Sequence, residues 1–329
     1  MRVTHFHRAK CKGISIERLF KHIRSAVSYK IEIKVCYLPF GGTNPFCLLF
    51  NIIWAAFHQG EINHITGDCH YIALGLSRKN TILTIHDCVN LHKLKGLKRK
   101  IHKLLWYYLP CKCAKVITVI SDFSRQELIN ELPWTSDKVQ VIHNCVDPEF
   151  SKKPFQNKPG KPVILQIGTK QNKNLDMVAN ALNGLECHLR IIGPLNETQL
   201  TMLKEYKIDY SNTSNISDKQ LQIEFEKSDI LLFVSTYEGF GLPIIEAQAI
   251  GRPVITSNLE PMVEIAGDGA CIVDPSNADS IRKGLLLIIN DLTYKNKITN
   301  SGIQNVKRFQ TNKITAHYTA LYRKILKIS

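Results

Sequence analysis

The sequence predicts an α/β protein built from two parallel β-sheets, each with helices on both faces. Three observations support this prediction. Strand-like and helical stretches alternate along the chain, several strands are continuous apolar runs, and one proline- and lysine-rich stretch interrupts the pattern. Continuous apolar strands are typical of parallel sheets buried on both faces. A chain of 329 residues, 44% of them apolar and without low-complexity tracts, is long enough for two domains.

Strands and helices are expected in regular succession through both halves. The first half predicts helices over 14–27, 97–109 and 123–132, and six strands: "RVTHF", "IEIKVCYL", "INHIT", "TILTIHD", "KVITVIS" and "VQVIHN". The second half predicts five strands, again with helices between them: "PVILQIG", "HLRIIG", "DILLFVS", "PVITS" and "ACIVD". This alternation favours parallel pairing with crossover helices. The amphipathic, basic stretch "KITAHYTALYRKILKIS" predicts a final helix.

The domain boundary is predicted in "DPEFSKKPFQNKPGKP", residues 147–162, where prolines and lysines replace the periodic pattern. We therefore expect an N-terminal Rossmann-like domain over 1–147 and a C-terminal one over 148–311. The last helix, 312–329, is expected to pack back on the first domain. Two such sheets would face each other across a cleft, with ligands at the carboxyl ends of the strands.

Several segments bear on the cellular compartment. The opening "MRVTHFHRAK" is not followed by the apolar core of a signal peptide. The run "PFCLLFNIIWAAFH", 45–58, is too short to span a bilayer, and we expect a helix buried against a sheet rather than inserted in a membrane. The ten cysteines are scattered, with no two pairs at zinc-ligand spacing. This pattern favours reduced, mostly buried thiols in a cytosolic protein.

The charge is strongly positive and uneven. The net charge is +15, and residues 1–150 carry 21 Lys and Arg against 11 Asp and Glu. Such a balance suits nucleic acid, acidic lipid or phosphorylated substrates. In "HKLKGLKRKIHKLLWYY", 92–108, six cations precede three aromatic residues. This segment suits an anionic membrane surface, although nucleic-acid phosphates or simple solvation would explain the cations equally well.

The stretch "STYEGFGLPIIEAQAIG", 235–251, carries the most chemistry. A buried strand leads into a glycine-containing loop, and a helix is expected from Pro243 to a cap at Gly251. Backbone N–H groups and the positive end of the helix dipole would favour a phosphate above the sheet. Glu238 and Glu246 cannot bind that phosphate and would instead accept hydrogens from hydroxyls at its two ends. A phosphate between two polyol ends describes a nucleotide sugar.

The longer stretch "STYEGFGLPIIEAQAIGRPVITS" resembles the core motif of family 4 glycosyltransferases, which are retaining enzymes with the GT-B fold. Further blocks resemble the same family in the same order: "GISIERLFKHI", "NHITGDCHYIALGL", "TILTIHDCVNL", "VITVISDFSRQEL", "VQVIHNCVDPEF", "ILQIGTKQNKNLDMVANAL" and "LRIIGPL". The resemblance covers nearly the whole chain and points to the bacterial members that build surface polysaccharides. It implies transfer of a sugar from a nucleotide-sugar donor to a glycan or lipid-linked acceptor.

The resemblance also implies roles for individual residues. His86 would lie beside the reacting sugar, and Glu238 would face the donor sugar. Lys173 would contact the diphosphate, and Glu246 would hold the ribose hydroxyls. The loop residues that would present backbone amides to the sugar and diphosphate are Gly239, Phe240, Gly241 and Leu242.

Two positions depart from the family pattern. Thr169 stands where many members have arginine, so Lys170 is a candidate for the second phosphate contact. The first loop, which is glycine-rich in the family, has a single glycine here, Gly13 in "HRAKCKG". No Asp-x-Asp pair is present in the sequence, so neither a metal nor another cofactor is expected. Protein groups alone would then stabilise the leaving diphosphate.

Other functional classes stay open at this point. One is a nucleic-acid-binding or DNA-modifying GT-B relative, which the charge alone supports, because recognition motifs are absent and no nucleic acid is expected. Another is an inactive partner subunit that binds nucleotide sugar. A nucleotide-sugar epimerase or a phosphorylase of the same fold is a further possibility. The favoured interpretation is a retaining, metal-independent hexosyltransferase, cytoplasmic and peripheral on the inner face of the plasma membrane.

Overall fold

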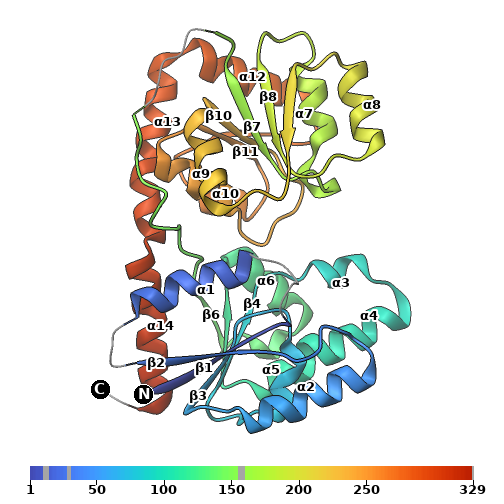
Figure 1. The fold of residues 1–329 in the computed structure, drawn as a ribbon, viewed down its shortest axis with the longest axis vertical. Helices are drawn as coiled ribbons and strands as arrows, with labels where there is room; N and C mark the ends of the chain where they lie inside the picture. The colour runs from blue at the N-terminus through green and yellow to red at the C-terminus, as the bar shows by residue number, and fades with distance from the viewer. Residues whose placement is uncertain (10–14, 28–30, 155–159, 328–329) are drawn as a thin grey trace. The chain divides into compact units, whose positions relative to one another are not determined.

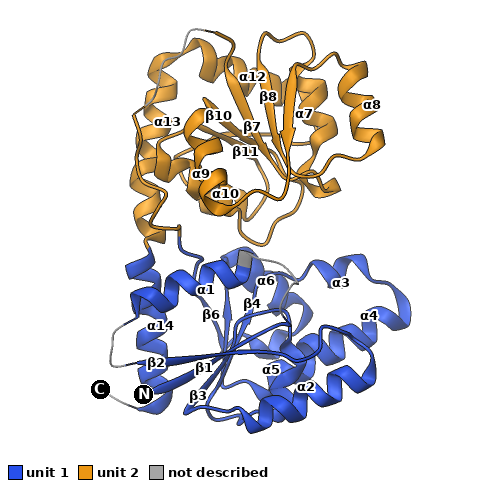
Figure 2. Ribbon diagram, viewed as in Figure 1, with its two compact units in different colours: residues 1–145, 311–329 blue, residues 146–310 orange. Residues whose placement is uncertain are grey.

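Two six-stranded parallel sheets organise the computed structural model, which describes residues 1–9, 15–27, 31–154 and 160–327. By its internal contacts the chain divides into two units (Figure 2). Unit 1 comprises Met1–Cys145 and Thr311–Ser329, and unit 2 comprises Val146–Gln310. The last helix therefore belongs to unit 1, although the whole of unit 2 precedes it in the sequence.

The sheet of unit 1 has the order β2-β1-β3-β4-β5-β6, with every pair parallel (Figure 1). Its strands are β1 (Arg2–His7), β2 (Glu32–Tyr37), β3 (Ile62–Ile65), β4 (Thr81–Ile85), β5 (Val116–Val119) and β6 (Val139–Val141). Its helical segments are α1 (Ser15–Ala26), α2 (Pro45–Phe57), η1 (His70–Gly75), α3 (Val89–Lys93), α4 (Gly96–His102), the π-helical η2 (Lys103–Tyr108), α5 (Leu109–Cys113), α6 (Asp122–Glu131), η3 (Pro133–Thr135) and α14 (Thr311–Leu326).

Helices cover both faces of this sheet, because successive residues of a strand point to opposite sides. On one side Val3 and Ile82 pack in a core cluster with Phe20 of α1 and Tyr318 of α14. On the other side Phe6 of β1 packs with residues of α2, η1 and α5. Both faces are therefore buried, which accounts for the continuous apolar strands.

Unit 2 repeats the architecture with the order β12-β11-β10-β7-β8-β9. Its strands are β7 (Val163–Ile167), β8 (His188–Ile192), β9 (Tyr210–Thr213), β10 (Ile230–Phe233), β11 (Val254–Ser257) and β12 (Cys271–Val273). Its helical segments are η4 (Gln171–Lys173), α7 (Leu175–Leu182), α8 (Glu197–Glu205), α9 (Asp218–Lys227), α10 (Leu242–Ile250), α11 (Met262–Ala266), α12 (Ala278–Asn290), α13 (Leu292–Asn305) and η5 (Val306–Phe309). One core cluster joins β7, β8 and β10 to α7 and α12.

The predicted α/β class is confirmed, and all eleven predicted strands are present. One strand, β9, was not predicted. Its sequence is "YSNT", it lies at the edge of the sheet, and among the described strands it pairs only with β8. An edge strand does not need the apolar run that marks a buried strand, so its sequence gives little signal. None of the nine cysteines described forms a disulfide, and all but Cys47 are buried, as expected.

The expected burial of residues 45–58 is wrong. A helix is present, but Asn51 and Ala55 are its only fully buried residues. Five large apolar side chains of α2 are exposed: Phe46, Leu49, Phe50, Ile53 and Phe57. Only one face of α2 packs against the core of unit 1, so the high apolar content of the helix did not imply burial on all sides.

The basic segment 92–108 also differs from expectation. Trp106 and Tyr107 are buried, so they are not available to a membrane surface. Arg99 and Lys103 form ion pairs with Glu131 of α6. The exposed apolar side chains of this region are instead Leu97, Ile101 and Leu104. Within the described residues, no helix is long and apolar enough to cross a bilayer.

Candidate active site

The loop between β10 and α10 contains most of the predicted site residues. Gly241 is the N-cap of α10 and has φ of +108°, a conformation that favours glycine. It offers no side chain to cap the helix, and Pro243 follows in the first turn. The N-terminus of α10 therefore presents the positive end of its dipole without a side-chain cap. The helix ends at Gly251 in the left-handed conformation, as predicted.

Lys173 lies across Gly168, in the loop that follows β7. Gly168 has φ of +87°, and a Cβ atom there would lie 2.9 Å from Cγ and Cε of Lys173. Lys173 Nζ lies 2.6 Å from Glu238 Oε1 and 4.5 Å from the ring centre of Phe233. The side chains of Lys173 and Glu238 are only 17% and 16% exposed. The space left by Gly168, the ring of Phe233 and the carboxylate of Glu238 together determine the direction in which the lysine side chain extends.

Hydrogen bonds tie the lysine loop to the Glu238 loop. Asn172 Nδ2 donates to Tyr237 O at 2.9 Å and to Glu238 Oε1 at 3.3 Å. In return, the Thr236 N–H donates to Asn172 O at 2.9 Å. Asn174 Nδ2 donates to Val234 O at 3.1 Å. Two loops that are far apart in the sequence therefore form one rigid edge of the sheet, with Lys173 and Glu238 in contact.

The remaining predicted residues of unit 2 lie on the same loop and helix. Phe240 is buried, with its ring edge-on to Phe309 at 5.7 Å, so its side chain anchors the loop. Glu246 is buried and is the fifth residue of α10. It therefore lies at the start of the second helical turn. Gly239 and Leu242, on either side of the glycine cap, are half-buried.

Thr169 is a structural residue. It is buried, its hydroxyl donates to Pro194 O at 2.5 Å, and its carbonyl accepts from Gln199 Nε2 at 2.6 Å. No cation stands at this position, while the side chain of the next residue, Lys170, is exposed. The predicted Gly13 lies outside the described residues.

His86 lies in unit 1, directly after β4, whereas the other predicted site residues lie in unit 2. Its Nε2 is 2.8 Å from the carbonyl oxygen of Thr66. Since a carbonyl can only accept, Nε2 carries the proton and Nδ1 carries the lone pair. Burial lowers the pKa of His86 below 6.5, and the hydrogen bond to Thr66 opposes that shift. The ring is therefore neutral at pH 7 and can accept a hydrogen at Nδ1.

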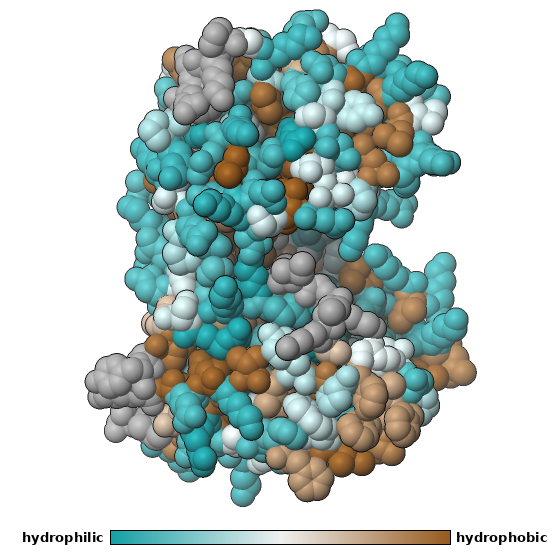
Figure 3. Space-filling view, in the orientation of Figure 1, coloured by the Kyte–Doolittle hydropathy of each residue, from teal (hydrophilic) through white to brown (hydrophobic). Residues whose placement is uncertain are grey.

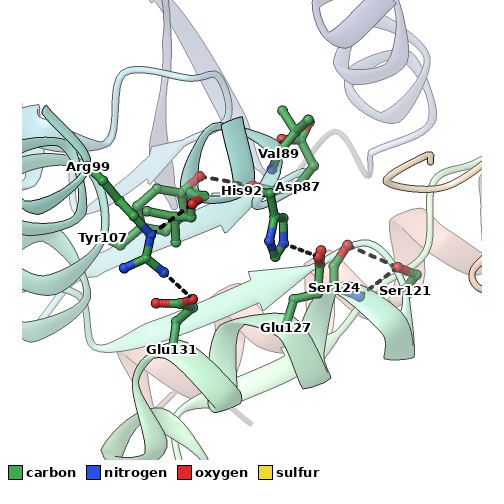
Figure 4. Close-up of polar contacts among 10 residues, drawn as sticks. Asp87, Val89, His92, Arg99, Tyr107, Ser121, Ser124, Glu127 and Glu131 are labelled. Carbon is green, nitrogen blue, oxygen red and sulfur yellow. Dashed lines mark hydrogen bonds and ion pairs between the residues drawn. The ribbon is translucent and has the colours of Figure 1, made fainter. Parts of the chain in front are cut away.

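The segment that follows His86 is held by polar contacts (Figure 4). The Val89 N–H donates to Asp87 Oδ1 at 3.0 Å, and the Tyr107 hydroxyl donates to Asp87 O at 3.1 Å. Farther along, His92 contacts Glu127 at 2.6 Å and Arg99 contacts Glu131 at 2.7 Å. These contacts attach α3 and α4 to α6, which fixes the loop on which His86 lies.

Sequence reasoning did not select a pocket of about 140 Å³ in unit 1. Its lining includes Arg8, Leu38 and Asp68, which follow β1, β2 and β3, together with Phe40 and Trp106. Arg8 and Asp68 are polar residues that follow the ends of parallel strands. Because these ends lie at one edge of the sheet, such residues could have indicated the pocket from the sequence. Within the described ranges, no cluster of three or more His, Cys, Asp or Glu side chains could hold a metal ion.

Two family models match the chain. Residues 147–305 match "Glycosyl transferases group 1", and residues 33–150 match "Glycosyltransferase Family 4". Together they account for most of both units. The chain belongs to glycosyltransferase family 4. It is a glycosyltransferase with the GT-B architecture, as the sequence predicted.

Similar proteins agree with this assignment. The O-antigen chain mannosyltransferase B of Escherichia coli is 25% identical over 276 residues, which are 74% of this chain and 70% of that protein. A glycosyltransferase from Rickettsia africae has the same fold, with a TM-score of 0.77 and 19% identity, covering 100% of this chain and 99% of the other. Anabaena Alr3699/HepE in complex with UDP-glucose has a TM-score of 0.78 at 14% identity, with 99% of each chain covered.

Proposed function

We propose that this glycosyltransferase transfers a sugar, with retention of configuration, from a nucleotide-sugar donor to a glycan or lipid-linked acceptor of a surface polysaccharide or lipopolysaccharide. The observation that carries the proposal is the 2.6 Å contact between Lys173 and Glu238 near the uncapped N-terminus of α10. The similarity to an O-antigen mannosyltransferase supports the acceptor class. The similarity to a protein solved with UDP-glucose supports the donor class.

The donor would bind with its diphosphate near Lys173 and the amides of Gly239–Leu242. During transfer, the bond between the anomeric carbon and the diphosphate oxygen breaks, the acceptor hydroxyl gives its proton to the departing diphosphate oxygen, and the acceptor oxygen bonds to the same face of that carbon. Negative charge develops on the leaving diphosphate. A fixed ammonium group and the N-terminus of α10 stabilise that charge with no reorganisation cost. Lys173 has three N–H donors, so it can bind a phosphate oxygen while it keeps its contact with Glu238.

The other site residues would orient the two ends of the donor. Glu246 would accept hydrogens from the ribose hydroxyls, and Glu238 would face the sugar. His86 would accept a hydrogen from a sugar hydroxyl at Nδ1, which a neutral ring with its proton on Nε2 can do. No metal or other cofactor is required in this scheme, because protein groups supply the positive charge.

We further propose that the enzyme acts as a peripheral protein on the inner face of the plasma membrane. Four lysines of the 92–108 segment, Lys93, Lys95, Lys98 and Lys100, are exposed. Each cation near an anionic leaflet contributes about 1 kcal/mol, screened over roughly 8 Å at physiological salt. Nothing in the family assignment supports a nucleic-acid-binding module or an inactive partner subunit.

Thermal stabilisation by a panel of nucleotide sugars tests the donor proposal. The panel covers the common bases and includes mannose and glucose donors. A bound donor raises the unfolding midpoint by mass action. We expect at least one donor to raise it in the wild type and to raise it less in Glu246→Ala. If no nucleotide sugar raises the midpoint at millimolar concentration, the donor proposal is wrong.

A further inference from the structure

One face of α2 exposes apolar side chains to solvent without interruption. This α2 face consists of Phe46, Leu49, Phe50, Ile53 and Phe57, whose exposed fractions are 68%, 60%, 42%, 48% and 85%. The spacing places all five on a single stripe of the helix, about 100° wide. Exposed apolar residues are ordinary when single, but a contiguous patch marks an interaction surface.

Contacts on the opposite side of α2 prevent the helix from rotating to bury this face. Asn51 is buried, and its Nδ2 donates to Phe40 O and to the Tyr71 hydroxyl, both at 2.8 Å. The Phe40 N–H in turn donates to Asn51 Oδ1 at 3.2 Å. Ala55 is buried in the core of unit 1. The hydrogen bonds of Asn51 and the burial of Ala55 hold this side of α2 against the rest of unit 1. The α2 face on the opposite side therefore stays toward solvent.

Basic side chains accompany the apolar surface of unit 1. Leu97 and Ile101 of α4 and Leu104 of η2 repeat at helical spacing, and all three are exposed. Figure 3 shows hydrophobic side chains gathered on unit 1 over α2 and around the end of α4. Of the four exposed lysines named above, Lys98 and Lys100 lie between Leu97 and Ile101 in the sequence, and the other two precede Leu97 by two and four residues. Neither residues 33–60 nor residues 88–121 contain an aspartate or glutamate.

We propose that the α2 face inserts into the headgroup region of an anionic lipid bilayer, with the exposed lysines of α3 and α4 contacting the lipid phosphates. Large apolar side chains with cations nearby are the composition that binds such an interface. A second copy of the chain is a poorer occupant, because pairing two such surfaces would bring lysines together with no acidic residue from either segment to neutralise them. The bilayer supplies both the apolar environment and the opposite charge.

The α2 face continues into the pocket of unit 1 through one aromatic residue. Phe40 lines the pocket, and its ring lies 5.0 Å from that of Phe50 and 6.0 Å from that of Phe46. Arg8 and Asp68 line the same pocket. This step rests on the proposed function: a lipid-linked acceptor could keep its chain in the bilayer while its polar head enters the pocket.

Vesicle binding by the full chain tests the proposal. The probes are vesicles of phosphatidylcholine with and without phosphatidylglycerol, at low and at high salt. The test variant is F46S/L49S/F57S, which changes only exposed side chains. The matched control is L287S/L292S, which changes two exposed leucines of unit 2. Circular dichroism and transfer to a short soluble acceptor are measured on each variant, so a failure of the donor chemistry is distinguished from a failure of docking.

We expect the wild type and the control to bind anionic vesicles, with part of the binding retained at high salt. The test variant should lose roughly 100-fold in partition coefficient, because three large apolar groups no longer leave water. A tryptophan in F57W should be quenched by lipids that carry bromine on their acyl chains. Equal binding by test variant and wild type, no quenching, or a dimer that the three serines dissociate without any vesicle binding overturns the proposal.

Discussion

Acidification should destabilise unit 1 through its buried histidines. His5 and His7 of β1 and His64 of β3 are fully buried on the side of the sheet that α1 and α14 cover. Burial lowers the pKa of His64 to about 3, with the nearby His7 and His86 adding to the shift. Burial, followed by the charge of Arg24, likewise lowers the pKa of His7 to about 3. Burial also lowers the pKa of His5 well below its usual value, so all three histidines are neutral in the folded protein at pH 7.

The hydrogen bonds of this network are those of neutral rings. Among the described residues His5 Nδ1 has no hydrogen-bond partner, which makes it the bare nitrogen, so His5 Nε2 donates to the Tyr322 hydroxyl at 3.0 Å. That hydroxyl then donates to His64 Nδ1 at 2.8 Å, and His64 Nε2 donates to Thr84 at 2.7 Å. A second proton on His64 would leave two donors facing each other at Tyr322. Protonation therefore breaks the hydrogen bond between Tyr322 of α14 and His64 of the sheet.

The magnitude follows from proton linkage. The unfolded chain binds a proton at His7 and at His64 near pH 6.5, whereas the folded chain does not until about pH 3. Stability is therefore fully present above pH 6.5 and is lost as the pH falls below it. Between pH 7 and pH 5 each such histidine should cost about 2 kcal/mol. His7 and His64 together should lower the free energy of unfolding by about 4 kcal/mol.

Urea unfolding followed by tryptophan fluorescence measures this loss, because Trp54, Trp106 and Trp134 all lie in unit 1. His64→Gln should reduce the slope of stability against pH, between pH 6 and pH 5, by about 1 kcal/mol per unit. His317→Asn, which changes an exposed histidine of α14, should leave the slope unchanged. A free energy of unfolding that stays constant from pH 7 to pH 5 in the wild type would show that these histidines do not resist protonation in the folded protein.

Three further predictions concern the donor site. Glu246→Ala should weaken binding of the nucleoside diphosphate by about 1–3 kcal/mol, measured by calorimetry, since a buried hydrogen-bonding partner is lost; unchanged affinity would exclude the ribose role. His86→Ala and Glu238→Ala should lower kcat by at least about tenfold with smaller changes in nucleotide affinity, because both would act at the sugar. Wild-type kcat in either variant would end its assignment. Transfer should continue in excess chelator, and activity that a divalent ion alone restores would show that a metal takes part.

The donor loop was predictable from sequence because its chemistry is local. A buried strand, two glycines and a proline fix the loop and the start of α10 within a few residues. The contact between Lys173 and Glu238 could not be derived in the same way. It depends on β7 and β10 being neighbours in the sheet and on Gly168 leaving room for the lysine. The sequence of either segment alone does not show which distant strands pair.

The surface of unit 1 was predicted less well, since apolar content does not reveal which neighbours a helix has. Residues 45–58 form the expected helix, but the neighbours of α2 cover only one of its faces. The aromatic residues that follow the basic segment pack inward, where Trp106 contacts Tyr71 at 5.1 Å between ring centres. Composition identified both segments as unusual, and only the tertiary packing separated core residues from exposed ones.

The proposed donor site is tested by calorimetric titration of nucleoside diphosphates into the wild type, Lys173→Met and Lys283→Met. Lys283 is an exposed lysine of α12 and provides the matched loss of charge in unit 2. We expect at least one nucleoside diphosphate to bind the wild type and Lys283→Met equally. Lys173→Met should bind it about 10- to 100-fold more weakly, the cost of one hydrogen bond to a charged group. Binding of equal strength to Lys173→Met, or no binding of any nucleoside diphosphate to the wild type, would contradict the proposed donor site.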